Sequence, residues 1–137
     1  MDPITGKSAD GVAWPTGIFA ITLFVEDLAA AKKFYQAVFG LPVVFEDNNS
    51  AVFKFGNTLI NLLIITQADE LIGPAKVAGR EAGARFVFTL HVDDVDAMCA
   101  QLTAGGVKLL NGPMDRPWGV RTASFIDPGG HIWEIAK

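Results

Sequence analysis

A carboxylate in the last predicted strand is the side chain best suited to acid–base chemistry. Glu134 alternates with Trp133 and Ile135, so its side chain is expected on the opposite face of that strand. A carboxylate in a partly apolar pocket has a raised pKa and can act as a general base, or it can pair with a cationic ligand. A solvated position at the edge of a sheet, with no function, is the alternative, and both interpretations stay open.

Two histidines can exchange protons near neutral pH. His91 ends a predicted strand on the face where a ligand can contact it, although a lone histidine in a strand is more often a surface or capping residue. His131 follows two glycines in a predicted turn and is expected to be exposed to solvent. Of the two, His91 is the candidate for a ligand contact.

An arginine and three aromatic residues have the chemistry to bind an anionic or flat molecule. Arg121 ends a Trp-Gly-Val-Arg run, and its planar guanidinium can bind such a ligand or neutralise Glu134. A surface salt bridge is the alternative. Large apolar rings stack on flat ligands at low entropic cost, which makes Trp118, Phe24 and Phe53 candidates as well. Each ring can instead fill the core or a dimer interface.

Composition and motifs exclude several classes of function. The 137 residues carry a formal net charge of −4 with scattered lysines and arginines, so no basic face is available for nucleic acid. The single cysteine, Cys99, cannot form an internal disulfide, which fits a cytoplasmic protein. The sequence contains no nucleophile elbow, phosphate-binding loop or dinucleotide fingerprint, and no apolar run long enough to span a membrane. We expect neither a nucleic-acid nor a membrane partner.

The elements that must position these side chains form a first unit over residues 17–66. Apolar and polar residues alternate over 17–25, which predicts a strand. Asp27 is placed to cap a helix that Gly40 ends, and Pro42 prevents its continuation. Short strands are predicted near 41–47, 51–55 and 58–65, separated by polar turns. The unit is therefore a β-α-β-β-β arrangement.

The same pattern starts again in a second unit over residues 85–137. A strand is followed by a helix that Asp94 caps and Gly105-Gly106 ends, and strands are predicted near 107–111, 118–126 and 131–136. Residues 1–16 are expected to form an N-terminal arm and residues 67–84 a linker. We therefore predict one α+β domain, residues 17–137, made of two tandem modules.

The first strand of each module has two different faces. The large residues Phe19, Ile21, Leu23, Phe86, Phe88 and Leu90 are expected to face the helices. The opposite faces carry a mixed set, namely Ala20, Thr22, Phe24, Val87, Thr89 and His91. A mixed face of this kind is typical of a half-polar ligand cup, although a solvated sheet face has a similar composition.

Several segments together resemble the vicinal-oxygen-chelate superfamily of glyoxalases, bleomycin-resistance proteins and extradiol dioxygenases. They are Ile21-Thr-Leu-Phe-Val-Glu-Asp-Leu28 with Phe34-Tyr35, the repeat Phe88-Thr-Leu-His-Val-Asp-Asp-Val95, the run Trp118-Gly-Val-Arg121, and Phe125-Ile-Asp-Pro-Gly-Gly-His-Ile-Trp-Glu134. The resemblance implies mixed sheets that curl around a cup, often completed by a second chain in a homodimer.

The resemblance also implies where a metal would be held. Metal-dependent members place one ligand in the first strand and one in the fourth strand of each module, and these positions fall on Ala20, Asn61, Val87 and Glu134. Alanine and valine have no donor atom, and a neutral amide binds a divalent ion weakly. We therefore expect no metal or other cofactor, as in the bleomycin-resistance branch, whose members bind drugs without metal.

The leading hypothesis is a cytoplasmic protein that binds a small aromatic or amphiphilic molecule in a cup without metal, with sequestration of a drug or toxin as one role. The residues proposed to contact the ligand are Phe24, Phe53, Asn61, His91, Trp118, Arg121 and Glu134. The alternative is an enzyme of the same superfamily, of the lyase, isomerase or dioxygenase type, that uses Glu134 as base or metal ligand. A regulatory or structural module without a ligand is a third hypothesis.

Overall fold

The computed structural model describes residues 11–137, and most of the expected N-terminal arm therefore lies outside the described residues. The first module consists of β1 (Ala20–Val25), α1 (Leu28–Phe39), β2 (Val43–Glu46), β3 (Ser50–Phe55) and β4 (Thr58–Ile64). The second consists of β5 (Val87–His91), α3 (Val95–Ala104), β6 (Leu109–Asp115), β7 (Arg121–Ile126) and β8 (Ile132–Ala136). Between them lie η1 (Ile65–Gln67), α2 (Ala68–Ile72) and η2 (Arg80–Ala82).

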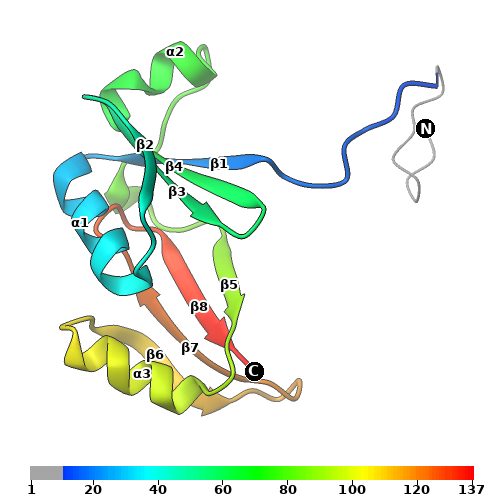
Figure 1. Cartoon of the computed structure of the whole chain (residues 1–137), viewed down its shortest axis with the longest axis vertical. Helices are drawn as coiled ribbons and strands as arrows, with labels where there is room; N and C mark the ends of the chain where they lie inside the picture. The colour runs from blue at the N-terminus through cyan, green and yellow to red at the C-terminus, as the bar shows by residue number, and fades with distance from the viewer. Residues whose placement is uncertain (1–10) are drawn as a thin grey trace.

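Each module forms its own four-stranded mixed sheet (Figure 1). The strand orders are β1-β4-β3-β2 and β5-β8-β7-β6, so the two modules repeat one topology. In both, the first and fourth strands are parallel and the other neighbours antiparallel. The predicted α+β fold of two tandem βαβββ modules is confirmed.

The residues expected to begin and end the two main helices do so. The carboxylate of Asp27 accepts from the Ala30 amide at 3.0 Å, and the carboxylate of Asp94 accepts from the Ala97 amide at the same distance. Such caps satisfy backbone donors that a helix leaves unpaired. Gly40 ends α1 with a positive φ of 65°, a conformation that costs glycine little. Residues close to the helix ends therefore determine where both helices lie in the sequence.

Two boundaries differ from the sequence-based expectation. The strand expected near 107–111 is β6 at Leu109–Asp115, and β7 begins at Arg121 rather than at 118. Trp118 consequently lies in the turn between them, which two backbone hydrogen bonds close, from Gly119 N–H to Arg116 O and from Arg116 N–H to Val120 O. The expected linker also contains the short helices α2 and η2.

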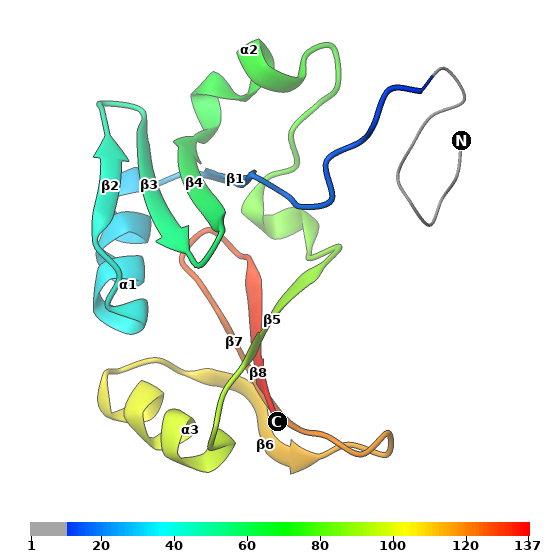
Figure 2. The same cartoon turned by 45° about the vertical axis from the view of Figure 1, so that its right-hand side comes forward.

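A single core joins the helix-side faces of the two sheets. It combines buried residues of the first module, such as Leu23 and Phe53, with Phe125 and Trp133 of the second. The ring of Phe39, at the end of α1, lies 4.9 Å from that of Trp133. Both α1 and α3 lie on the same side of the sheets in two views of the molecule (Figures 1 and 2). The apolar interior is therefore made by helices and sheet faces from both modules.

Two residues expected on the helix side do not join this core. Phe19 is 77% exposed and Phe86 is 51% exposed. Both precede the first paired residue of their strand, at Ala20 and Val87, so the alternation of the sheet does not reach them. Val25, at the opposite end of β1, is buried instead.

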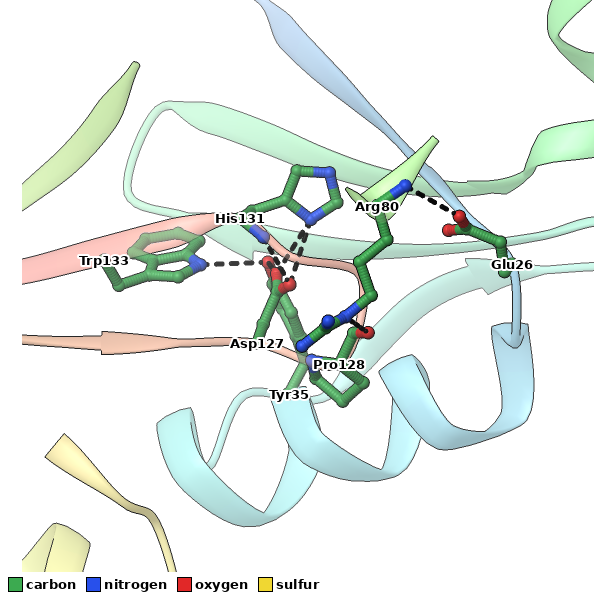
Figure 3. Close-up of polar contacts among 7 residues, drawn as sticks. All are labelled: Glu26, Tyr35, Arg80, Asp127, Pro128, His131 and Trp133. Carbon is green, nitrogen blue, oxygen red and sulfur yellow. Dashed lines mark hydrogen bonds and ion pairs between the residues drawn. The ribbon is translucent and has the colours of Figure 1, made fainter. Parts of the chain in front are cut away.

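A buried hydrogen-bond network connects α1 to the β7–β8 turn (Figure 3). The Tyr35 hydroxyl donates to Asp127 Oδ2 at 2.7 Å and accepts from Trp133 Nε1 at 3.1 Å. His131 Nδ1 and the His131 amide lie 3.0 and 2.9 Å from Asp127 Oδ1. Burial opposes ionisation of Asp127, but its contacts with His131 and Tyr35 outweigh burial and lower its pKa. Burial, followed by the charge of Asp127, raises the pKa of Tyr35.

The linker is fixed to both modules by Arg80 (Figure 3). Its amide donates to Glu26 Oε2 at 2.9 Å, just after β1, and its Nε donates to Pro128 O at 2.9 Å in the β7–β8 turn. A side chain at Gly130 would meet Arg80 Cγ at 2.8 Å, and Gly130 has a positive φ of 93°. Gly130 therefore leaves room for the linker to cross the turn. No helix within residues 11–137 is long and apolar enough to cross a membrane.

We expect Tyr35→Phe to lower the free energy of unfolding by about 2–4 kcal/mol, because it removes one hydrogen bond to a buried carboxylate and leaves the Trp133 N–H without an acceptor. Urea unfolding followed by circular dichroism measures the loss. Thr58→Val, which removes a solvent-exposed hydrogen bond from the Thr58 hydroxyl to Ile18 O, is the control and should cost about 0.5 kcal/mol or less.

Acid unfolding checks the same network. The pKa of Asp127 is lowered in the folded protein. The ionised Asp127 therefore contributes its full stabilisation at a pH above about 3.9, the pKa of an aspartate in an unfolded chain, and this stabilisation is lost as the pH falls through the pKa of Asp127 in the folded protein. The free energy of unfolding of the wild type should decrease in that acid range, and the decrease should be smaller for Tyr35→Phe. An equal acid dependence of the two proteins would contradict the role given to the Tyr35 hydroxyl.

Candidate functional site

Each sheet has a second face that the helices do not cover, and we call these the cup faces. Residues directly opposite on neighbouring strands point to the same side of a sheet, so the register identifies them. In the first module the pairs Thr22–Asn61 and Asn61–Val52 lie on this face, and in the second the pairs Thr89–Glu134 and Glu134–Ser124 do. The cup faces are thus equivalent surfaces of the repeat.

A threonine and an amide form the polar centre of the first cup face. Asn61 Nδ2 lies 3.4 Å from Thr22 Oγ1, which is a long hydrogen bond. The carbonyl oxygen Asn61 Oδ1 is buried and has no partner within the described residues. A buried acceptor without a donor costs free energy. The first cup face therefore holds an acceptor that a ligand donor can satisfy.

A threonine and a carboxylate occupy the corresponding place in the second cup face. The Thr89 hydroxyl donates to Glu134 Oε1 at 2.8 Å, and the side chain of Glu134 is half-buried. One carboxylate oxygen is thereby oriented by the chain, while the other accepts no hydrogen bond within residues 11–137. The threonine of the first strand and the polar residue of the fourth meet in both modules.

Arg116 lies on the second cup face, although no sequence pattern indicated it. Its Nε donates to Thr122 Oγ1 at 2.8 Å and its Nη2 to Asn111 Oδ1 at 2.8 Å. Thr122 precedes Ser124 by two residues, and Ser124 is paired with Glu134, so all three share one side of the sheet. A cation and an anion therefore occupy the same cup face, without forming an ion pair with each other.

Arg121 lies on the opposite side of the same strand. Its guanidinium binds both carboxylate oxygens of Asp96 on α3 at 2.9 Å and Asp115 Oδ1 at 3.1 Å. Hydrogen bonds from Arg121, with its charge, lower the pKa of Asp96 against the effect of burial. Arg121 therefore faces the helix side, where it neutralises two aspartates rather than Glu134.

The candidate aromatic residues separate into three environments. Phe53 is fully buried on the helix side, 5.6 Å from the Tyr35 ring, so it belongs to the core and not to a cup face. Phe24 is half-buried on the first cup face and lines a cavity of about 320 Å³ between β1, the linker and the β7–β8 turn. Trp118 is 70% exposed in the β6–β7 turn.

One of the two histidines lies in a different environment from the one expected. His91 ends β5 on the second cup face and is exposed to solvent. The side chain of His131, expected in solvent, is only 14% exposed, because Asp127 holds its Nδ1 and Phe86 lies 6.5 Å from its ring. His91 remains available to a ligand, and His131 belongs to the network that joins the modules.

Exposed apolar side chains surround the polar centre of each cup face. Phe45, opposite Val52, is 57% exposed on the first cup face. Val87 is 49% exposed and Met114, opposite Thr122, is 37% exposed on the second. A polar centre with an apolar surround is the composition of small-molecule sites. The chain itself leaves both apolar surrounds uncovered.

The cup faces do not provide a ligand set that fits a catalytic divalent metal. The positions corresponding to metal ligands hold Ala20, Asn61, Val87 and Glu134, which supply one carboxylate and one amide. Catalytic metal sites use about three strong protein ligands. No group of three or more His, Cys, Asp or Glu side chains suited to a metal ion occurs in the described part of the chain.

Comparison with known proteins identifies close relatives of this arrangement. A sequence model of the Glyoxalase/Bleomycin resistance protein/Dioxygenase superfamily matches residues 17–135. The uncharacterized protein YraH of Bacillus subtilis (strain 168) is 36% identical over 124 residues, which cover 88% of this chain and 97% of that protein.

Solved structures share the fold over most of its length. A glyoxalase-related enzyme from Fulvimarina pelagi has a TM-score of 0.77 at 26% identity, covering 89% of this chain and 88% of its own. A glyoxalase/bleomycin resistance protein/dioxygenase from Nocardioides has a TM-score of 0.81 at 25% identity, covering 91% and 84%. A lactoylglutathione lyase from Agrobacterium tumefaciens has a TM-score of 0.70 at 26% identity, covering 89% and 93%.

We expect Asn61→Leu to leave the free energy of unfolding unchanged or to raise it by about 1 kcal/mol, since it removes a buried carbonyl that has no donor. Urea unfolding of the ligand-free protein measures the difference. Asn48→Leu, a substitution at an exposed position, is the control and should change the free energy of unfolding by less than about 0.5 kcal/mol. A loss above about 1 kcal/mol for Asn61→Leu would show that the amide stabilises the fold.

Proposed function

Because the chain belongs to the glyoxalase/bleomycin resistance protein/dioxygenase superfamily, we propose that it binds a small aromatic or amphiphilic molecule in a cup, without a metal. Sequestration of a drug or toxin is the role that this binding serves. The unsatisfied acceptor of Asn61, set in an apolar surround, carries the proposal. A ligand with a donor and a flat apolar body supplies what that surface lacks.

The polar groups of the cup faces give the ligand its orientation. Asn61 Oδ1 accepts from a ligand donor in the first module, while Glu134 and His91 offer charged or polar contacts in the second. Phe24 and Phe45 provide flat apolar surface for a ring. A few placed polar groups among apolar ones are how such pockets combine affinity with specificity.

A second copy of the chain completes the cup. Both cup faces expose apolar side chains, among them Phe45, Val87 and Met114, and Trp118 projects from the nearby turn. Several large apolar side chains exposed on the cup faces are more typical of an interface than of a free monomer surface. A homodimer in which the cup face of one copy covers that of the other removes this surface from water and encloses the ligand.

An enzymatic function of the same surface is favoured by one observation, the fixed orientation of Glu134. The hydrogen bond from Thr89 holds one of its oxygens, and the other is free to take a proton from a carbon next to a carbonyl. The structural similarity to a lactoylglutathione lyase makes lyase or isomerase chemistry the form this alternative takes. In this alternative Glu134 is the catalytic residue.

We expect the amphiphilic dye anilinonaphthalene sulfonate to bind the wild type in a saturable manner, and Val87→Glu to weaken it by roughly tenfold or more, because a charge is placed in the apolar surround. Leu71→Glu, an exposed apolar-to-acidic change on α2, is the matched control and should bind as the wild type does. Fluorescence titration measures affinity, and light scattering measures the mass. A monomeric wild type with unsaturable dye fluorescence would refute the cup.

Glu134→Gln separates the two functions. If the protein is a binder, the variant should hold the dye with an affinity within about threefold of the wild type, because the amide oxygen still accepts from Thr89. If the protein is an enzyme, the variant should lose the proton exchange at a carbon next to a carbonyl that nuclear magnetic resonance detects in deuterium oxide with hemithioacetal or dicarbonyl probes. Exchange by the wild type but not by the variant would replace the binding hypothesis with the enzymatic one.

A further inference from the structure

The β6–β7 hairpin carries two arginines, of which only one is paired with carboxylates. Arg121 points to the helix side and donates to the carboxylates of Asp96 and Asp115. Arg116, on the cup face, donates to a hydroxyl and an amide oxygen, which are both neutral. The chain neutralises one guanidinium and not the other, although the two arginines are only five positions apart in the sequence.

The free edge of the Arg116 guanidinium has a defined direction. Nε and Nη2 form one edge of the planar group, and Thr122 and Asn111 take one hydrogen bond from each. A guanidinium has five N–H donors, so the end formed by Nη1 and the second Nη2 hydrogen remains unused within residues 11–137. That end is the fork that binds a carboxylate with two parallel hydrogen bonds.

The Arg116 fork is also held in place before any ligand arrives. Thr122 is 1% exposed and belongs to a strand paired on both sides, so the hydroxyl that accepts from Nε is held by the sheet. The backbone of Arg116 is fixed by its hydrogen bonds to Val120 and Gly119 in the hairpin turn. A preorganised donor pair binds an anion without the entropy cost of ordering a long side chain.

The charge of Arg116 is uncompensated although the chain as a whole is acidic. The protein has 15 acidic residues against 11 lysines and arginines, yet none forms an ion pair with Arg116 in the described part of the chain. Glu134 shares the cup face and is the nearest candidate by register, but it is bonded to Thr89 instead. A half-buried cation without a counter-ion attracts an anion from solution.

We propose that Arg116 is the anchor for a carboxylate group of the ligand, and that the cup takes small aromatic carboxylates. This inference rests on the proposed binding function and specifies the class of molecule bound. The carboxylate lies against the β6–β7 end of the second cup face, and the ring extends over Met114, which is 37% exposed opposite Thr122. Glu134 repels an anion placed on it, which fixes the direction in which the ligand enters.

The experiment compares naphthoate with its neutral amide, naphthamide, on the full chain. Naphthoate should bind at least about tenfold more tightly than naphthamide, since a charged bidentate contact replaces a neutral one. Arg116→Gln should abolish that preference without preventing either compound from binding, and Arg116→Lys should retain part of it. Arg121→Gln, on the same strand but paired to aspartates, is the matched control and should keep the full preference.

A spectroscopic measurement locates the contact independently of affinity. In protein labelled with nitrogen-15, naphthoate should shift the Nε–Hε signal of Arg116 and leave that of Arg121 in place. Equal affinities for the two compounds, or an unmoved Arg116 signal at saturation, would overturn the role of Arg116 while the binding function stands. If neither compound moves the signals of any cup-face residue, and the dye does not bind either, both the anchor and the binding function are refuted.

Discussion

The hydrogen bond from the Tyr35 hydroxyl to Asp127 lies where the two modules meet, and the positions of both sheets depend on it. Tyr35 belongs to the helix of the first module and Asp127 to the last turn of the second, 92 residues later in the chain. The carboxylate accepts from the tyrosine, from an imidazole and from a backbone amide, so its buried charge is satisfied by groups that come from both modules. The surrounding rings, among them Phe39 and Trp133, supply the apolar contact area that such a network needs.

Because the helices and one face of each sheet are used for this joint core, the other faces carry little of the folding free energy. Leu23 and Phe125 are almost fully buried, whereas Val87 and Phe45 are about half exposed. The two groups lie on opposite sides of their sheets, since alternate residues of a strand point to opposite faces. The difference between a structural face and the cup face of each sheet is therefore a consequence of strand geometry and of the duplicated topology.

Local signals predicted the fold well, and the candidate site only in part. The caps at Asp27 and Asp94 and the positive φ of Gly40 depend on neighbours within a few residues, so their sequence is sufficient to find them. Strand alternation predicted that Glu134 lies on the face opposite to the core, and the register of β1 and β4 puts Asn61, which the resemblance indicated, on the equivalent face. The alternation of residues along a strand could not predict which sheet face Arg116 and Arg121 occupy, because the length of the hairpin turn between them decides which one faces the cup. For a related reason the ligand contact proposed for Phe53 and the solvent exposure expected for His131 were wrong, since the burial of these side chains depends on Tyr35 and Asp127 from distant segments.

The duplicated plan also governs how the protein can change over evolutionary time. Thr22 with Asn61 and Thr89 with Glu134 occupy equivalent places, but one pair is neutral and the other charged. Since neither pair belongs to the joint core, one of these residues can be replaced, and the polar character of its cup face changed, without loss of the apolar contacts on which folding depends. Each module can thus acquire new ligand chemistry while its twin preserves the old, which makes a short repeated chain an adaptable source of new specificities.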